Sequence, residues 1–278
     1  MHPKIERTLR QAARNTLRLP SESQLVYDTL APRGPGVMVD VGAHRGSALH
    51  PFAAAGWRVL AFEPDELNRR HLLHNVEGLG AVEVDPRAVS TTPGETVSIY
   101  RSSESAAIST LTPFVDTHVQ AGVVTTTTLA LACREHGVGE IDFLKVDTEG
   151  YDFFVLQSLD WSAIRPRAVL CEFENRKTVP LGYTWRDMAE FLAGHGYRVV
   201  VAEWYPVQRY GAVHRFRRFA DYPCPLADEN ATGNLVAFRD AGDFERFQGV
   251  RRAFETRRFP PRFVSRALYR AVLALRRR

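Results

Sequence analysis

The sequence predicts an α/β fold of the Rossmann-like type, with a mainly parallel seven-stranded sheet and helices on both faces. Short and almost wholly apolar runs, such as residues 37–41, are typical of parallel strands buried on both faces. These runs alternate with helical segments, as the crossover connections between parallel strands require. Ligands of such sheets bind at the carboxyl ends of the strands, so we expect a site where the first run ends in a glycine turn.

The expected elements follow one another from the N-terminus. Residues 4–18 are expected to form a basic helix, and a loop rich in proline and glycine precedes the first strand. The seven strands are expected at 37–41, 58–62, 81–85, 141–146, 168–173, 197–202 and 235–238, with a further strand at 97–100 before a region rich in Ser and Thr. Helices are expected at 46–56, 65–76, 129–136, from 151 onward and at 184–195. Asp65 is the expected N-cap of the second of these helices.

The chain of 278 residues suits one large domain with appendages. We expect a basic helix and linker over 1–36, the main domain over 37–240 and a basic helical extension over 241–278. Residues 251–278 contain ten Arg and one Glu. Within them, residues 263–278 have apolar residues at helical spacing between the arginines. Such a basic amphipathic helix predicts peripheral contact with an anionic membrane. The alternatives are docking on the acidic body of the protein and a solvated tail. No nucleic-acid-binding motif accompanies the arginines.

Cysteine usage and hydropathy bear on the cellular compartment. The three cysteines are widely spaced and form no CxxC pair, which argues against a zinc site or a disulfide framework. We see no secretory signal and no apolar run long enough to span a bilayer. The sequence therefore predicts a cytoplasmic protein that reaches the inner face of the membrane only peripherally.

The turn after the first strand predicts a nucleoside-containing ligand. Gly42 permits a tight turn and a close approach to the backbone, and Gly46 lets the next helix pack near the strand. The second strand ends in Glu63, where a carboxylate can accept hydrogen bonds from both ribose hydroxyls. The G-x-x-x-G spacing lacks the middle glycine with which NAD enzymes cradle a pyrophosphate. S-adenosylmethionine has no phosphate, so an acid such as Asp40 beside the turn suits it better.

Residues 141–153 form the most specific segment. An apolar strand delivers Asp147 and Glu149 to its carboxyl end, and Lys145 projects to the same side as Asp147. The neighbouring strand ends in Glu172 and Glu174, so several carboxylates gather at one edge. Such clusters are costly unless they are paired, protonated or bound to a cation, and this cost points to function.

Four segments resemble the FkbM-type methyltransferase family in the same order: VMVDVGAHRGS, VLAFEPDELNRRHLLHNV, TTTLALACREHGVGEIDFLKVDTEGYDFFVLQSL and VLCEFE. The resemblance covers roughly 37–240. It implies a class I methyltransferase fold, S-adenosylmethionine as the cofactor, and methyl transfer to hydroxyls of sugars and polyketides. It also implies that Asp40, Gly42 and Glu63 contact the cofactor and that Asp147 lies near the reacting methyl group. Asn68 and Asn75 match family positions. The further candidate cofactor contacts are His44, Gly46, Pro64, Asn68 and Asp85.

Two positions depart from the family pattern. The family usually has Asn where this chain has His44, which puts the role of that turn residue in doubt. The family also reads T-L-D before the fourth strand, where this chain has Ala130, so no acid acts at that position.

Methyl transfer to an aliphatic hydroxyl needs alignment of the reactants and removal of a proton. The candidate catalytic residues are Asp147, Glu149 and Lys145, with the two acids as candidate bases. Lys145 has a structural alternative, in which it neutralises the carboxylates. Glu149 has one as well, as an acid near a helix N-terminus. We assign no metal ligand, although Asp147 with Glu172 or Glu174 is a tentative set for Mg²⁺.

Three other residues are candidates for contact with the methyl acceptor. His118 is a weaker candidate base, with a surface histidine as the alternative. Trp204 and Tyr205 open an irregular segment, 203–233, that is expected over the cleft. The acceptor is expected to be a small molecule or glycan, and the oligomeric state stays open. The competing functions are a non-catalytic nucleoside-binding partner of glycan-assembly enzymes and, less well supported, an NAD-dependent oxidoreductase.

Overall fold

The computed structural model describes residues 21–102, 109–114, 116–208 and 214–258. The basic segments expected to be helical at 4–18 and 263–278 lie outside these residues. None of the helices within the described residues is long and apolar enough to cross a bilayer. The division into three segments at 36 and 240 remains a prediction.

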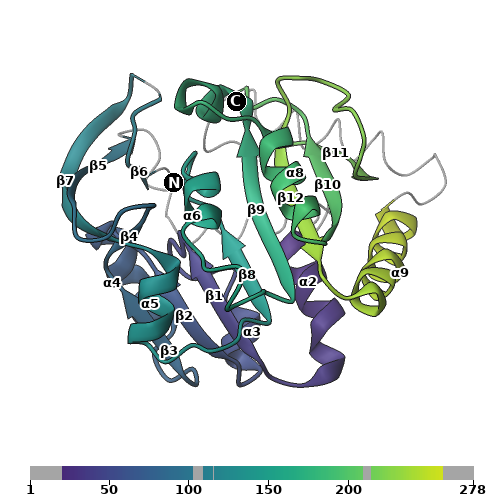
Figure 1. Cartoon of the computed structure of the whole chain (residues 1–278), viewed down its shortest axis with the longest axis horizontal. Helices are drawn as coiled ribbons and strands as arrows, with labels where there is room; N and C mark the ends of the chain where they lie inside the picture. The colour runs from purple at the N-terminus through teal and green to yellow at the C-terminus, as the bar shows by residue number, and fades with distance from the viewer. Residues whose placement is uncertain (1–20, 103–108, 115, 209–213, 259–278) are drawn as a thin grey trace, which may run out of the picture.

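An eight-stranded sheet runs through the molecule in the order β11-β10-β12-β9-β8-β1-β2-β3 (Figure 1). Its strands are β1 (Val37–Val41), β2 (Arg58–Phe62), β3 (Val82–Asp85), β8 (Phe143–Val146), β9 (Ala168–Glu174), β10 (Arg198–Trp204), β11 (Phe216–Asp221) and β12 (Thr232–Phe238). The run β9-β8-β1-β2-β3 is parallel, whereas β12 pairs antiparallel with both β9 and β10, and β11 pairs antiparallel with β10. The Rossmann-like α/β class is therefore confirmed. The expected count of seven strands misses β11.

The helices are α2 (Glu22–Leu30), α3 (His50–Ala54), α4 (Glu66–Asn75), α5 (Leu129–Glu135), α6 (Asp152–Gln157), α7 (Asn175–Thr178), α8 (Trp185–Gly194) and α9 (Ala241–Arg258), with short 3₁₀ turns η1 (Ala31–Arg33) and η2 (Val179–Leu181). Asp65 caps α4 as expected, since its side chain accepts a hydrogen bond from the Asn68 N–H. The first expected crossover helix, 46–56, is shorter than predicted and spans only α3.

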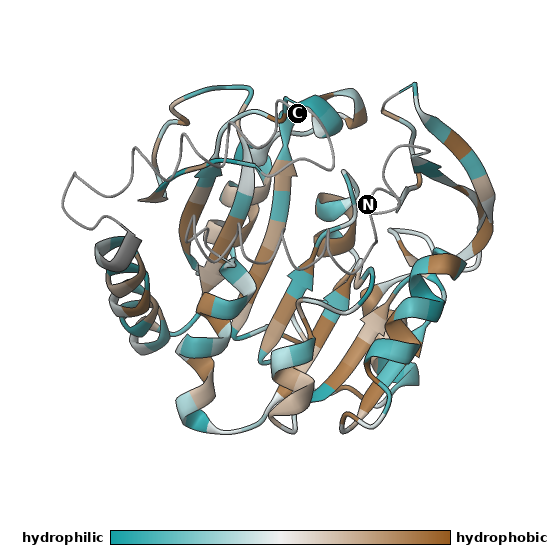
Figure 2. Ribbon diagram, turned by 180° about the vertical axis from the view of Figure 1, so that it is seen from behind, coloured by the Kyte–Doolittle hydropathy of each residue, from teal (hydrophilic) through white to brown (hydrophobic). Residues whose placement is uncertain are grey.

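Alternating strand residues divide the apolar core between the two faces of the sheet. Val39, Leu60 and Leu144 face the cluster formed with α5, α6 and α8. Met38 and Val59 face the cluster formed with α2, α3, α4 and α9. Figure 2 shows the same pattern, with strongly hydrophobic strands between helices of mixed polarity. Helices on both faces leave the carboxyl ends of the parallel strands as the edge where polar loops gather.

A second, four-stranded sheet stands beside the carboxyl edge of the large sheet, in the order β4-β7-β5-β6 (Figure 1). It consists of β4 (Ala88–Val89), β5 (Thr96–Ser102), β6 (Ser109–Thr110) and β7 (His118–Thr127). The sequence predicts β5, but β7 falls in the segment that was interpreted only as polar. Most of β7 is exposed, so its Thr-rich sequence lacks the apolar alternation that marks a half-buried strand. All four strands come from the connection between β3 and α5.

The first and last described helices, α2 and α9, pack against each other in opposite directions. Arg33, which follows α2, pairs with Asp243 at the start of α9 at 3.2 Å. At the other end, the Trp204 indole N–H donates to Glu22 Oε1 at 2.7 Å. Trp204 in turn contacts Phe216, whose ring also contacts Phe254 near the end of α9. The start of α2 and the end of α9 therefore lie at one corner of the molecule.

Candidate active site

The turn after β1 packs directly against the loop after β8. Gly42 has a φ of 79°, in the left-handed region that favours glycine, and a Cβ there would overlap with the carbonyl oxygen of Asp147. The Asp147 N–H donates to the Val41 carbonyl oxygen at 2.9 Å. Gly42 is therefore required both by its own conformation and by the neighbouring backbone.

Glu63 follows β2 beside this turn and is only 4% exposed. Its Oε2 accepts a hydrogen bond from the His44 N–H at 2.7 Å, and its Oε1 accepts one from the Asp65 N–H at 2.9 Å. Burial raises the pKa of Glu63 to about 8, against the opposing effect of these two N–H groups. Each carboxylate oxygen has a further lone pair, so Glu63 can accept two more hydrogen bonds.

The rest of the turn is shaped by backbone strain and by contacts with α4. His44 has a φ of 51°, a left-handed conformation that Asn, Asp and His adopt more readily than most residues. This preference explains how His44 can replace the Asn that is usual in the family. Gly46, at φ 83°, packs so closely on Leu72 that a Cβ would lie 2.7 Å from its Cδ1. Asn75 Nδ2 donates to the Arg45 carbonyl oxygen at 2.9 Å, which gives Asn75 a structural role.

Lys145 connects the ends of β1 and β8. Its Nζ lies 3.0 Å from Asp40 Oδ1 and 3.4 Å from Asp147 Oδ2. Asp40 is fully buried, and burial raises its pKa, although the adjacent Lys145 opposes this shift. Burial alone would lower the pKa of Lys145, but the charges of Asp40 and Asp147 raise it overall. The structural alternative for Lys145, in which it neutralises carboxylates, fits this arrangement.

Asp147 is the accessible member of this group. Its side chain is 42% exposed, compared with 0% for Asp40 and 7% for Lys145. A group that removes a proton from a substrate must reach it, and only Asp147 of these three has an open face. Lys145 lies behind it as a fixed positive charge.

A second group of carboxylates surrounds Lys177, a buried residue of α7. Lys177 Nζ lies 2.6 Å from Glu149 Oε2, 2.9 Å from Glu172 Oε2 and 3.1 Å from Glu174 Oε2. Burial raises the pKa of Glu149 and of Glu172, which shows that one ammonium group only partly offsets the cost of burying the carboxylates. Glu149 is also held by its backbone, with a φ of 56°.

This geometry gives the magnesium alternative no support. Glu172 and Glu174 converge on Lys177 Nζ rather than on a free position shared with Asp147. Among the described residues, no group of three or more His, Cys, Asp or Glu side chains is arranged to hold a metal ion. Lys177 therefore supplies the positive charge that these carboxylates require.

Sequence reasoning missed Lys177 and Asp152 as members of the site. Asp152 is buried at the start of α6 and accepts hydrogen bonds from Thr148 N–H and Oγ1 and from the Glu172 N–H. Burial raises the pKa of Asp152 to about 6. Its position two residues after Gly150, within the specific segment 141–153, could have marked Asp152 as a site residue. No signal marked Lys177, because nothing in the sequence relates a short helix after β9 to Glu149.

Three further predicted cofactor contacts are Asp85 at the end of β3, Asn68 in α4 and Pro64 just after β2. The Asp85 carboxylate binds Arg87 Nη2 at 2.6 Å and His136 Nε2 at 3.1 Å. Burial acts to raise the pKa of Asp85, but the Arg87 and His136 contacts outweigh it and lower that pKa. Asn68 is buried, with Nδ2 3.5 Å from Ser109 Oγ. The Pro64 carbonyl oxygen accepts a hydrogen bond from Arg69 Nη1. The oxygens of Asp85 are thus already engaged by protein cations.

The candidate acceptor residues differ in their surroundings. Trp204 holds α2 through Glu22, a packing role. The Tyr205 ring contacts the guanidinium groups of Arg215 and Arg217 at 4.4 and 4.3 Å. His118 Nδ1 accepts a hydrogen bond from the Phe114 N–H at 3.2 Å, so a neutral His118 carries its proton on Nε2. Burial and the charge of Lys177 lower the pKa of His118. A neutral His118 in this tautomer is a hydrogen-bond donor at Nε2, not a base.

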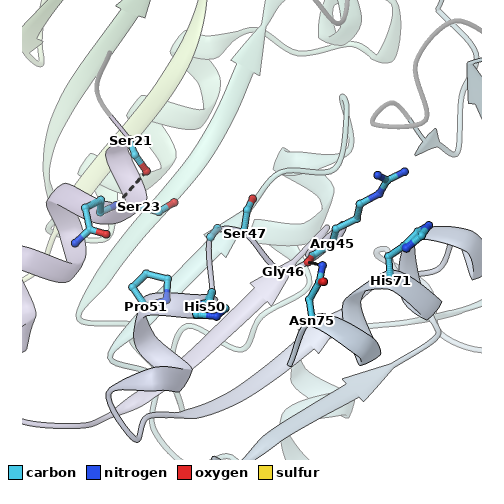
Figure 3. Close-up of a pocket in the computed structure, with 11 residues that line it drawn as sticks. Ser21, Ser23, Arg45, Gly46, Ser47, His50, Pro51, His71 and Asn75 are labelled. Atoms are coloured by element: carbon cyan, nitrogen blue, oxygen red, sulfur yellow. Dashed lines mark hydrogen bonds between the residues drawn. The ribbon is translucent and has the colours of Figure 1, made fainter. Parts of the chain in front are cut away.

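A cavity of about 850 Å³ opens on the outer side of the glycine turn (Figure 3). Arg45, Gly46 and Ser47 of the turn line it together with residues at the start of α2 and α3 and along α4. Its charged and titratable lining is basic, with Arg45, His50 and His71. Neither Glu63 nor Asp147 lines this cavity, so it is separate from the acidic groups described above.

Comparisons with known proteins identify the family of the chain. The family model described as methyltransferase FkbM domain matches residues 40–199, more than half of the chain. No curated protein matches the sequence. The chain is similar in structure to precorrin-6y C5,15-methyltransferase from Geobacter metallireducens GS-15, with a TM-score of 0.42, 12% identity, and coverage of 78% of this chain and 86% of that one. Magnesium protoporphyrin IX methyltransferase from Synechocystis PCC 6803, solved with bound SAH, gives a TM-score of 0.43, 12% identity, and coverage of 86% and 89%.

Proposed function

Because the chain belongs to the FkbM methyltransferase domain family, we propose that it methylates a hydroxyl group with S-adenosylmethionine as the methyl donor. We further propose that the hydroxyl belongs to a sugar, a glycan or glycolipid, or a related natural product. The observation that best supports the proposal is that Glu63 and Asp147 flank the Gly42 turn. One acid is buried and fixed, and the other is exposed.

Glu63 suits a nucleoside. Backbone N–H groups fix the orientation of both carboxylate oxygens and leave acceptor capacity that two ribose hydroxyls match. The Gly42 backbone offers a close approach without a side chain. Asp40 and Asp147 lie at the end of the neighbouring strands and provide negative charge near a sulfonium cation. Pro64, Asn68 and His44 complete the proposed surroundings.

S-adenosylmethionine supplies an electrophilic methyl group, and the acceptor oxygen displaces S-adenosylhomocysteine from it. The proposed role of Asp147 is to take the proton that the hydroxyl loses as the new C–O bond forms and the C–S bond breaks. Lys145 holds the Asp147 carboxylate in place from behind at 3.4 Å. Glu149 is held by Lys177, and its proposed part is to shape the acceptor side of the cleft.

Calorimetry with S-adenosylhomocysteine tests the cofactor site. We expect binding by the unmodified protein and at least about tenfold weaker binding by Glu63→Ala, since two ribose hydrogen bonds are lost. Glu95→Ala, which removes an exposed acid just before β5, is the control. Unchanged affinity in Glu63→Ala would remove Glu63 from the site.

Transfer of a labelled methyl group to glycan and lipid extracts, followed by mass spectrometry, tests the acceptor class. A hydroxyl that gains the mass of one CH₂ group supports the proposal. Binding of S-adenosylhomocysteine without transfer to any glycan or lipid favours the non-catalytic alternative.

A further inference from the structure

One corner of the small sheet reaches the loops on both sides of the glycine turn. In the β5–β6 pair, Arg101 lies opposite Ser109. Both side chains contact Asp65, with Arg101 Nε 2.8 Å and Ser109 Oγ 3.2 Å from Oδ2. The next residue, Thr110, has its hydroxyl 3.2 Å from the Glu149 carbonyl oxygen. Two adjacent residues of β6 thus touch the loop after β2 and the loop after β8.

These contacts place β6 above the end of β1. The order of the large sheet is β8-β1-β2, so a segment that touches the loops after β8 and β2 must pass over the turn between them. That turn contains Gly42 and His44. The small sheet, seen beside the upper end of the strands in Figure 1, is therefore fixed across the proposed cofactor position.

Asp65 is the point through which this corner reaches Glu63. Its carboxylate is completely buried and is bound by Arg101, Ser109 and the Asn68 N–H. Its own N–H donates to Glu63 Oε1 at 2.9 Å. Its hydrogen bonds and the Arg101 guanidinium together offset the cost of burying this carboxylate. Any movement of Asp65 changes one of the two bonds that orient Glu63.

We propose that Arg101 and Ser109 are positioning residues for the nucleoside, because they hold Asp65 and, through it, the carboxylate of Glu63. This inference rests on the proposed function of the site. Neither residue needs to touch the ligand. The small sheet is thereby part of the proposed cofactor site. A change at Arg101 in β5 or at Ser109 in β6 alters the orientation of the Glu63 carboxylate.

The charges around Glu63 make the coupling measurable. The negative charge of Asp65 raises the pKa of Glu63, after the larger effect of burial. Removal of Arg101 takes a positive charge away from the Asp65–Glu63 pair, so we expect the pKa of Glu63 to rise further. Asp40 and Asp65 act on Glu63 through their charges, and His44 and Asp65 donate backbone N–H groups to it. Lys145 binds Asp40, and Arg101 binds Asp65. Arg69 donates to the Glu63 carbonyl oxygen, and the Glu63 N–H donates to the Asp85 carbonyl oxygen.

The test is titration of S-adenosylhomocysteine by calorimetry between pH 6 and pH 9 into the unmodified protein, Arg101→Gln, Arg101→Lys and Ser109→Ala. An anionic Glu63 accepts ribose hydrogen bonds, so affinity should rise with pH in the unmodified protein. In Arg101→Gln this rise should move to higher pH, with about tenfold weaker binding at pH 7 for a pKa shift of about one unit. Arg101→Lys should restore most of the affinity. Ser109→Ala should give a smaller loss in the same direction.

Arg167→Gln is the matched control. Arg167 Nε binds the fully buried Asp243 at 2.7 Å near the opposite end of β9, so its loss also removes an arginine from a buried aspartate. Circular dichroism confirms that each variant is folded under the titration conditions. Wild-type affinity and pH profile in Arg101→Gln, or an equal pH-independent loss in Arg167→Gln, would overturn the inference. If the unmodified protein does not bind the ligand at all, the proposed function fails and this inference fails with it.

Discussion

At the scale of single residues, the site is built from acids in very different surroundings. Asp40 and Glu63 are buried, and Asp147 is exposed. Carboxyl groups of the same intrinsic acidity can therefore hold a ligand, balance a lysine or accept a proton, according to burial and partners.

Asp147→Asn should bind S-adenosylhomocysteine as the unmodified protein does but transfer methyl groups at least about a hundredfold more slowly, because the amide cannot take the proton. The rate is measured as labelled methyl incorporation into the acceptor found by mass spectrometry. Asp228→Asn, a partly exposed acid paired with Arg217, is the control and should keep its rate. A fully active Asp147→Asn variant would exclude Asp147 as the base.

Gly42→Ala should lower the free energy of unfolding by about 2–5 kcal/mol, because a φ of 79° and overlap with the Asp147 carbonyl oxygen act together. Gly94 has a similar φ of 81° with open space around it, so Gly94→Ala should cost only about 1–2 kcal/mol. Urea denaturation of both variants measures the difference. Equal costs would show that the contact with Asp147 is unimportant.

Glu63 should make the ligand-free protein less stable as the pH rises. Its pKa is about 8 in the folded protein and near 4.5 when unfolded, so the folded state binds the extra proton. The group's contribution is fully present below about pH 4.5 and is lost as the pH rises toward 8. Between pH 5 and pH 8, unfolding free energy should therefore fall more in the unmodified protein than in Glu63→Gln. Parallel pH dependence in the two proteins would contradict the raised pKa.

At the scale of elements, the parallel strands and their crossover helices were predictable because each carries a local signal. The strands β1 and β2 are almost wholly apolar, β9 begins with the apolar run AVLC, and Asp65 marks the start of α4 as an N-cap. Strand β11 was missed because it falls within a segment that lacks a continuous apolar run. Its sequence, FRRFAD, carries two adjacent arginines, and Arg217 and Arg218 are needed by the buried Glu203 rather than by solvent.

The site was predictable to the same extent as the strands that deliver it. Strand ends meet at one edge of a parallel sheet, which is why Glu63, Asp147 and Glu172 could be grouped in advance. That rule does not predict which cationic residues contact these acids or their neighbours. Lys177 follows the last residue of β9 by three positions, and Arg101 belongs to a sheet inserted after β3. Their contacts depend on tertiary packing that no local pattern records.

Helix α7 offers a prediction at this scale, since Lys177 fastens it to the ends of β8 and β9. Lys177→Met leaves the carboxylates of Glu149, Glu172 and Glu174 together without their cation, which should destabilise the protein by about 3–5 kcal/mol at pH 8. At pH 5 the loss should be smaller, because burial raises the pKa of Glu149 and of Glu172, and protonation of these two groups reduces the repulsion. Lys177→Arg should retain most of the stability. Denaturation at the two pH values tests this, and a pH-independent loss would contradict it.

At the scale of the whole molecule, the basic ends of the chain remain the basis for the proposed membrane contact. Residues 1–20 and 259–278 both carry a strong excess of Arg and Lys over acids. Deletion of 259–278 should reduce cosedimentation with phosphatidylglycerol vesicles, because each basic residue near an anionic surface contributes about 1 kcal/mol. Binding of S-adenosylhomocysteine should be unchanged. Vesicle binding that persists after deletion, or that ignores added salt, would contradict an electrostatic contact.

The antiparallel packing of α2 and α9 brings the start of α2 close to the end of α9. Glu22 and Phe254 are joined through Trp204 and Phe216, so the start of α2 and the end of α9 lie at one corner of the described structure. Trp204 is the last residue of β10, whose carboxyl end lies on the same side of the sheet as those of β9 and β8. The start of α2 and the end of α9 therefore lie toward the same edge of the large sheet as Glu63 and Asp147.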